Sequence, residues 1–266
     1  DDIRNAADIL NHIYENSNHN DGYVSLEVDP FLANDFEKTL SEAEKLWAKV
    51  NKKNLMIKIP GTKEGIKATK LLLEKGINVN ITLLFSFESY KNTLEAFIES
   101  KSKNNNSRSV ASFFISRIDT AVDNLLDPKN KFFHKMAIIN AFKAYSLFLE
   151  NKHKMGENFQ RLLWASTSVK SKDLNEEYYS YNLPLKDTIN TLPLETIDYL
   201  LKSQILDSNN LEISKNFESL FEESKQHFDF EKITNTLLAN GIKLFQESYK
   251  SVLDTIDQKI SKLINK

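Results

Sequence analysis

The sequence predicts an α/β protein built on a parallel sheet, and two observations lead to this prediction. Short apolar or alternating runs, typical of strands, are separated by longer stretches whose apolar residues recur every three or four positions, as on one face of a helix. Strands that alternate with helices are joined by right-handed crossovers, which produce a parallel sheet. No linker, internal repeat or change of composition divides the 266 residues, so we expect one domain over 1–266.

Composition narrows the function classes. The chain is 41% hydrophobic and 27% charged with a formal net charge of −2, so no basic field predicts nucleic acid, and no apolar run approaches the roughly 18 residues of a membrane helix. Cysteine is absent, which excludes thiolate metal sites and fits a reducing compartment; we expect a cytoplasmic protein. The five histidines lack the spacing of a metal site, so we expect no metal and small molecules as partners.

Six strand candidates are found along the chain. In the first, at 23–29, alternation places Ser25, Glu27 and Asp29 on one face, and in the third, at 78–84, it places Asn80 and Thr82 together. The others span 54–62, 109–117, 162–167 and 188–191. Polar residues therefore share one side of several neighbouring strands.

Helical stripes occupy the intervals between these strands. They span 3–14, 31–50, 62–75, 86–100 and about 128–150, and a terminal helix runs from 231 to 263. Thr62 is a suitable N-cap for the third helix and Gly76 a suitable end. For the terminal helix, an interruption near Gly241 is an open alternative.

Lys58 stands inside the apolar second strand, just before the turn signal Pro60-Gly61. Burying an ammonium group costs several kcal/mol unless the group is paired or loses its proton. The stretch alone favours a sheet edge or a structural ion pair over a functional amine, and the rest of the chain must decide.

The strand count also bears on the fold. An eight-stranded TIM barrel of about 250 residues would need two strands more than the six found here. Because the chain begins with Asp1 and not with methionine, we expect these two strands to precede it. On this reading, 1–200 holds barrel units three to eight and 201–266 holds C-terminal helices that cover the barrel.

Polar residues gather where the strands end, and in a parallel barrel all these ends open on the face that carries the active site. Neither a glycine-rich nucleotide loop nor a Ser-His-Asp elbow occurs, so we expect no cofactor. An amine, a carboxylate, hydroxyl and amide groups and cations suit carbonyl chemistry on a phosphorylated substrate, in which a lysine forms a Schiff base that acts as an electron sink.

Five segments in order resemble the strand signatures of the transaldolase family: Val24–Pro30, Met56–Thr62, Gly76–Ser86, Ser109–Arg117 and Trp164–Lys170. The resemblance runs from about residue 1 to about residue 200. It implies a transferase of the pentose phosphate pathway that moves a dihydroxyacetone unit from sedoheptulose 7-phosphate to glyceraldehyde 3-phosphate. It is also compatible with a terminal helix over the barrel mouth, and we expect a monomer or a homodimer.

The resemblance also implies residue roles. Lys58 would be the Schiff-base lysine, Glu27 would move protons through a water molecule, and Thr82 would help to hold that water. Substrate contacts fall to Asn80 and Ser112 for hydroxyl groups, to Arg117 for the phosphate, and to Ser166 and Lys170 at the fifth strand. There the chain departs from the family, which has an arginine where this sequence has Ser168.

A second departure concerns the proton of C–C cleavage. The family carries an aspartate at the end of its first strand and an asparagine after its second, and both strands would precede Asp1. Either residues precede Asp1 or the molecule is inactive. The alternative functions are a Schiff-base aldolase that releases the free ketone, and a non-catalytic barrel used for interaction.

Single site residues also have structural alternatives. Arg117 could form an ion pair with Asp119 or Asp123, and Thr82 and Asn80 could form hydrogen bonds to the backbone.

Overall fold

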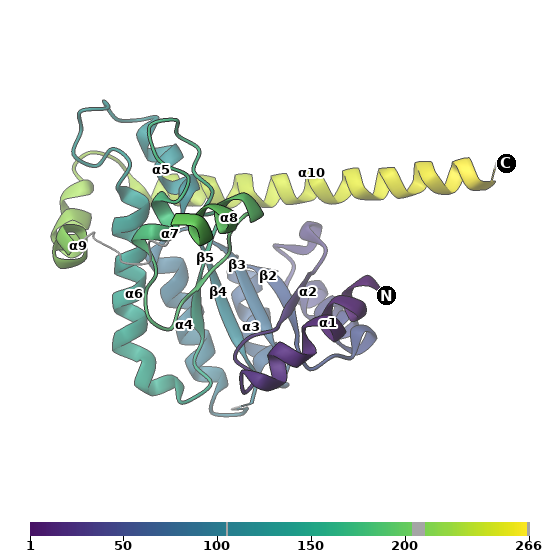
Figure 1. Cartoon of the computed structure of the whole chain (residues 1–266). Helices are drawn as coiled ribbons and strands as arrows, with labels where there is room; N and C mark the ends of the chain where they lie inside the picture. Colours follow the sequence, from purple (N-terminus) through teal and green to yellow (C-terminus); the bar gives the residue numbers. More distant parts are fainter. Residues whose placement is uncertain (105, 204–210, 265–266) are drawn as a thin grey trace.

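The protein is built on one parallel sheet of six strands. The computed structural model describes residues 1–104, 106–203 and 211–264. The strands are paired in chain order, each parallel to the next, in an open, curled sheet (Figure 1). Their bounds are β1 Val24–Glu27, β2 Leu55–Pro60, β3 Val79–Leu84, β4 Ser109–Phe114, β5 Arg161–Ala165 and β6 Ile189–Asn190. The α/β class, the parallel sheet and the six strand locations are confirmed.

Helices follow the strands and cover one side of the sheet. α2, α3, α4 and α6 pack against one another in that order (Figure 1). The helices are α1 Asp2–Asn16, α2 Phe36–Val50, α3 Lys63–Glu74, α4 Phe87–Ser100, α5 Ser116–Asp123, α6 Met136–Met155, α7 Tyr178–Asn182, α8 Leu194–Ser203, α9 Leu211–Ser224 and α10 Phe230–Ile264, with a 3-10 turn η1 at Pro30–Leu32. This succession of a strand and an outer helix is the unit of a TIM-like fold.

The predicted caps of the third helix are confirmed. The Thr62 side chain accepts a hydrogen bond from Gly65 N at 2.9 Å, which satisfies one of the free amide groups of the first turn of α3. The chain turns after α3 through Gly76, whose φ of +81° lies in the left-handed region that glycine adopts without strain.

Three predicted element bounds are wrong. The helix expected from 31 begins at Phe36, because Asp35 caps it and the preceding turn is η1. The strand expected over 109–117 ends at Phe114, and α5 begins at Ser116. The helix expected from 128 begins at Met136. In the segment before Met136, the Asp127 side chain accepts a hydrogen bond from Lys129 N, and the Asn130 side chain accepts one from Phe132 N. Such local hydrogen bonds compete with helix formation.

The helix α10 is continuous through Gly241, so the alternative of an interruption there is wrong. Gly241 is buried, and a Cβ atom at this position would lie 3.0 Å from Leu83 Cδ2. Leu83 stands in a register shift of β3 with a φ of 59°, which turns its side chain towards α10. The absence of a side chain at Gly241 therefore allows α10 to pack closely against the end of β3.

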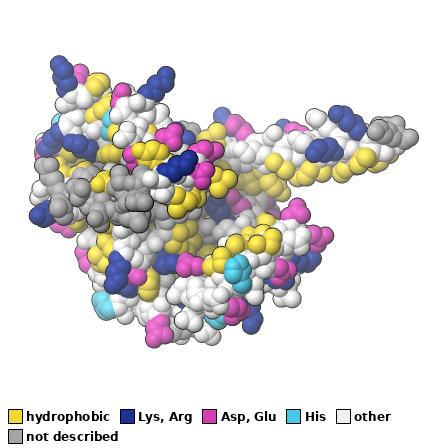
Figure 2. Space-filling view, viewed as in Figure 1, with side chains coloured by type: hydrophobic (Ala, Val, Ile, Leu, Met, Phe, Trp, Pro, Cys, Tyr) yellow, Lys and Arg dark blue, Asp and Glu magenta, His cyan; other side chains and the backbone are white. Residues whose placement is uncertain are grey.

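The two halves of α10 differ in their surroundings. Its first half packs on η1, α5 and β3, and apolar side chains such as Leu238 and Ile242 pack against the core. The second half stands clear of the body, with hydrophobic side chains along its lower edge (Figure 2). These include Val252, Ile256 and Ile260, which are about half exposed. Over the described residues, no helix has both the length and the apolar character needed to cross a membrane.

Candidate active site

A cavity of about 510 Å³ occupies one face of the sheet. Most of its wall is made by alternate residues of β1 to β6, which point to the same side because side chains of a strand alternate between faces. Five of the predicted site residues line it, namely Glu27, Lys58, Asn80, Thr82 and Ser112. The alternation of side chains along the strands therefore correctly predicted that these residues, far apart in sequence, share one face of the sheet.

Lys58 and Glu27 form an ion pair within this cavity. They are partners in the register of β1 and β2, and Lys58 Nζ lies 3.3 Å from Glu27 Oε2. Both side chains are mostly buried, with exposed fractions of 26% and 30%. β2 pairs with β1 and with β3, so the alternative that Lys58 marks a sheet edge is wrong.

Two effects act in opposite directions on the pKa of the Glu27 carboxyl group. Burial disfavours its charged form and raises the pKa of Glu27 above its usual value, while the charge and hydrogen bond of Lys58 act in the opposite direction. Desolvation is the larger influence. A carboxyl group whose pKa moves up towards neutrality is better suited to both accept and return a proton.

Thr82 presents a hydroxyl group without a protein partner. The residue is fully buried and lines the cavity, yet no described group hydrogen-bonds to its Oγ1 atom. The alternative in which Thr82 is satisfied by backbone is therefore wrong. An unpaired buried hydroxyl group costs free energy, so a group that hydrogen-bonds to it would be stabilised there.

Asn80 is held at both ends of its amide by serines. Ser112 Oγ donates to Asn80 Oδ1 at 2.7 Å, and Asn80 Nδ2 donates to Ser25 Oγ at 3.0 Å. These partners are side chains, so the backbone alternative is wrong for Asn80 as well. Ser25 was not among the predicted site residues, although alternation had placed it on the same face as Glu27.

Arg117 lies beside the cavity and does not line it. Its guanidinium carbon is 5.4 Å from the ring centroid of Phe114, which does line the cavity. The proposed ion pairs with Asp119 and Asp123 are not formed: Tyr179 OH and Ala137 N donate to Asp119, and His134 is the partner of Asp123. This leaves the Arg117 guanidinium without a carboxylate partner in the described chain.

The two predicted residues after β5 also lie outside the cavity wall. Ser166 has a φ of 55°, and its Oγ atom is 3.2 Å from Ser116 Oγ, next to Arg117. Lys170 is exposed, and its Nζ atom donates to Ser168 Oγ at 3.0 Å. Ser166 thus neighbours Arg117 at the ends of β4 and β5, whereas Lys170 points to solvent-accessible surface.

An aromatic side chain from the other end of the chain approaches the lysine. The ring centroid of Phe245, on α10, lies 5.2 Å from Lys58 Nζ. Phe245 falls within the terminal helix expected over 231–263, but helical periodicity does not identify which of its residues lies near Lys58.

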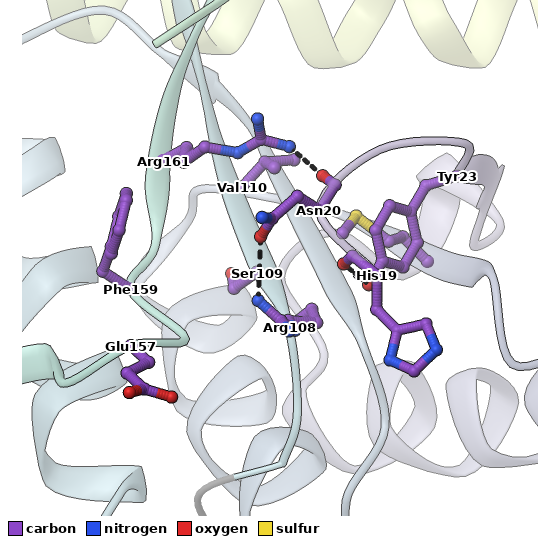
Figure 3. A pocket seen from close by; sticks show the side chains of 10 residues that line it. His19, Asn20, Tyr23, Arg108, Ser109, Val110, Glu157, Phe159 and Arg161 are labelled. Atoms are coloured by element: carbon purple, nitrogen blue, oxygen red, sulfur yellow. Dashed lines mark hydrogen bonds between the residues drawn. The ribbon is translucent and has the colours of Figure 1, made fainter. Parts of the chain in front are cut away.

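A second, smaller cavity of about 20 Å³ lies at the opposite ends of the strands (Figure 3). The side chains of Arg108 and Arg161 extend towards the loop before β1, and both donate hydrogen bonds to Asn20 (Figure 3). Arg161 also pairs with Asp21 at 3.1 Å. The space holds about one water molecule, and the two arginines fasten the loop to the sheet. The described residues contain no group of three or more His, Asp or Glu side chains that could hold a metal ion.

The fold and the main cavity define a class of protein: an α/β protein on a parallel sheet, with a lysine and a carboxylate side by side in a cavity made by neighbouring strands. Within that class, the family described as Transaldolase/Fructose-6-phosphate aldolase matches residues 1–256, and the chain belongs to this family. The resemblance read from the five strand segments is confirmed.

Individual relatives agree with this assignment. The chain is 38% identical over 293 residues to a protein named Transaldolase from Trichodesmium erythraeum, covering 98% of this chain and 77% of that protein. It is 38% identical to Transaldolase 2 of Nostoc punctiforme, with the same shares of 98% and 77%. It is 33% identical to a Transaldolase from Mycobacterium ulcerans, with shares of 99% and 77%.

Proposed function

We propose that this protein is a transaldolase that moves a dihydroxyacetone unit from sedoheptulose 7-phosphate to glyceraldehyde 3-phosphate through a Schiff base on Lys58. The products are erythrose 4-phosphate and fructose 6-phosphate, which places the reaction in the pentose phosphate pathway. The observation that carries the proposal is the pairing of Lys58 with Glu27 at 3.3 Å inside the cavity. Membership of the family supports the reaction type.

The first half of the reaction forms the Schiff base. The Lys58 amine attacks the substrate ketone, and the resulting carbinolamine loses its hydroxyl group as water to leave an iminium cation. Glu27 supplies and recovers protons through a water molecule, for which its raised pKa is favourable. Thr82 lines the cavity and its hydroxyl group has no hydrogen-bond partner among the described residues, so this group is the candidate to hold that water.

The second half moves the three-carbon unit. The iminium cation withdraws electrons from the neighbouring carbons, so the bond to the departing aldehyde breaks and an enamine stays on Lys58. The enamine adds to the acceptor aldehyde, and water hydrolyses the new iminium. Asn80, held in place by two serines, and Ser112 offer hydrogen bonds to substrate hydroxyl groups.

The phosphate contacts are assigned to the rim of the cavity. Arg117 has no carboxylate partner among the described residues, and a guanidinium group binds phosphate well because its fork matches two oxygens. Ser166 stands next to it, and Lys170 is the more distant candidate.

We further propose that the curled sheet is part of an eight-stranded barrel, with 1–200 as units three to eight and 201–266 as its C-terminal cover. The open edges at β1 and β6 support this, and so does the cleavage aspartate that the family resemblance assigns to an earlier strand. The intact mass of the native protein tests it: an excess of about 10 kDa over 30.7 kDa agrees with two further units, and equality contradicts them. A cytoplasmic location and a monomeric or homodimeric state stay predictions.

The test of the chemistry is reductive trapping on the native protein. Fructose 6-phosphate with borohydride should attach a three-carbon adduct to Lys58, and Lys58→Ala should abolish both the adduct and the transfer activity without loss of fold. Lys101 is an internal control, because it also lies over a phenylalanine ring, 4.5 Å from that of Phe97, but is not in the cavity wall. An adduct on Lys101 and none on Lys58 would refute the assignment.

The aldolase alternative is separated by the acceptor. A transaldolase turns over only when an acceptor aldehyde is present, whereas an aldolase releases free dihydroxyacetone without one. Measuring dihydroxyacetone release from fructose 6-phosphate alone therefore decides between the two.

A further inference from the structure

A carboxylate and an aromatic ring both approach the nitrogen of Lys58. Glu27 Oε2 approaches Lys58 Nζ to 3.3 Å, and the ring centroid of Phe245 is 5.2 Å from the same nitrogen. Glu27 belongs to the sheet, while Phe245 comes from α10 at the far end of the sequence. Nothing in the reaction scheme above uses the ring.

The fold holds this ring in place through contacts on either side of it. One turn before Phe245, the missing side chain of Gly241 lets α10 approach Leu83 at the end of β3. Directly after Phe245, Gln246 Nε2 donates to Pro30 O at 3.2 Å, which ties α10 to η1. The ring is therefore positioned over Lys58 by two fixed attachments of its own helix.

An aromatic face attracts a cation that lies within about 6 Å of its centroid, and the attraction grows when water is excluded. The proposed reaction changes the charge on this nitrogen. Glu27 first takes a proton from the Lys58 ammonium group. The lone pair of the resulting amine then forms the bond to the ketone carbon as the C=O π bond breaks, and a proton passes from the nitrogen to that oxygen to give the neutral carbinolamine. The carbinolamine hydroxyl group then leaves as water with a proton from Glu27, and the nitrogen of the resulting iminium carries the positive charge.

We propose that Phe245 is a catalytic residue of this site, whose ring stabilises the cationic iminium on Lys58 relative to the neutral carbinolamine. The inference rests on the proposed function, because it assumes that the Schiff base forms on Lys58. It adds an electrostatic role for the terminal helix.

The test compares Phe245→Leu with the unchanged protein in the borohydride assay, using saturating fructose 6-phosphate and mass spectrometry of the reduced adduct. Leucine keeps an apolar side chain but removes the aromatic face. The free ammonium group of Lys58 is also a cation beside the ring, so the ring favours only the step from the neutral carbinolamine to the iminium. We therefore expect the initial rate of adduct formation to fall about fivefold and kcat to fall with it. The Phe245→Trp variant, which has the stronger cation-binding ring, should form the adduct at least as fast as the unchanged protein.

The matched control is Tyr249→Leu, which removes a ring one turn further along α10, where the side chain is 38% exposed. The initial rate of adduct formation in this variant should equal that of the unchanged protein. Thermal unfolding of every variant checks the fold, and the tryptophan variant decides the question should the leucine variant unfold.

The outcomes separate the two proposals. If the unchanged protein forms no adduct on Lys58, the proposed function and this inference fall together. If it forms the adduct and Phe245→Leu forms it at an equal initial rate, or Phe245→Trp forms it more slowly, only the role of Phe245 is refuted.

Discussion

At Glu27, burial and a neighbouring cation act in opposite directions on one carboxyl group. Burial favours the protonated acid and raises the pKa of Glu27, whereas Lys58 at 3.3 Å favours the carboxylate. A group balanced in this way can exchange a proton with water at little cost. The ion pair therefore suits the proton transfers that we propose for Glu27.

Glu27→Gln should lower kcat by about 10²- to 10⁴-fold, because glutamine has no exchangeable carboxyl proton. In the unchanged protein, activity should fall as the pH drops through the raised pKa of Glu27, since the protonated acid cannot accept a proton. That acid limb should disappear from the pH–rate profile of the variant. Glu42→Gln, a change to a half-buried carboxylate outside the cavity wall, is the control and should keep the limb.

A second carboxyl group, Asp119, is fully buried two residues after Arg117. Burial raises the pKa of Asp119 to about 7, partly opposed by hydrogen bonds from Ala137 N and Tyr179 OH. In the unfolded chain the group loses its proton near the ordinary value of 3.8. As the pH rises from about 4 to about 7, the unfolded state deprotonates first, so the free energy of unfolding decreases through that window.

Asp119→Asn should therefore stabilise the protein at pH 8, by roughly 1 to 3 kcal/mol, and flatten the decline between pH 4 and pH 7. Asparagine can still accept the hydrogen bond from Ala137 and pair with Tyr179. Urea unfolding at several pH values measures the effect, with the exposed Asp173→Asn as the control that should change nothing. Destabilisation of Asp119→Asn at pH 8 would contradict the reasoning.

The sequence predicted the residues of the cavity wall well for a physical reason. Glu27, Lys58 and Asn80 are adjacent because parallel strands keep their ends level and alternation fixes the face. Two features could not be predicted in the same way. The place of Phe245 depends on how a helix distant in sequence packs on the sheet. The unpaired Thr82 hydroxyl group depends on which hydrogen bonds do not form in the folded protein.

At the scale of elements, the junction of α10 with β3 is the least local feature of the fold. The start of a helix was predictable where a capping residue marks it, as Thr62 does for α3. The start of α6 was predicted too early, at 128, because side chains in the segment before Met136 hydrogen-bond to nearby backbone. The contact of Gly241 with Leu83 follows neither from a cap nor from periodicity. It is set by the register shift in β3.

Gly241→Val should lower the transfer activity severalfold while the sheet stays folded. The new side chain would meet Leu83 Cδ2, since even its Cβ atom would lie at 3.0 Å, and α10 would move away from Lys58 together with Phe245. Leu83→Ala in the same protein removes the obstacle and should restore part of the trapping on Lys58. A double-mutant cycle on the adduct yield measures this coupling, and simple additivity would show that the contact does not position α10.

At the scale of the whole molecule, the open sheet and the projecting helix leave apolar surface uncovered. Side chains from Val252 to Ile264 on α10 are exposed, whereas several apolar side chains of its first half, such as Leu238 and Ile242, pack against the core (Figure 2). Exposed apolar side chains that touch nothing contribute little to the free energy of unfolding of the chain that carries them.

Deleting 251–266 should therefore leave the free energy of unfolding within about 0.5 kcal/mol of the intact chain and the adduct yield on Lys58 unchanged, because Gly241, Phe245 and Gln246 are retained. Deleting 241–266 removes Phe245 together with both attachments of its helix and should lose the adduct. Urea unfolding and borohydride trapping on both truncations measure the difference. A large destabilisation by the shorter deletion would mean that the second half of α10 packs on the protein in solution, and the exposed face would then be part of its core.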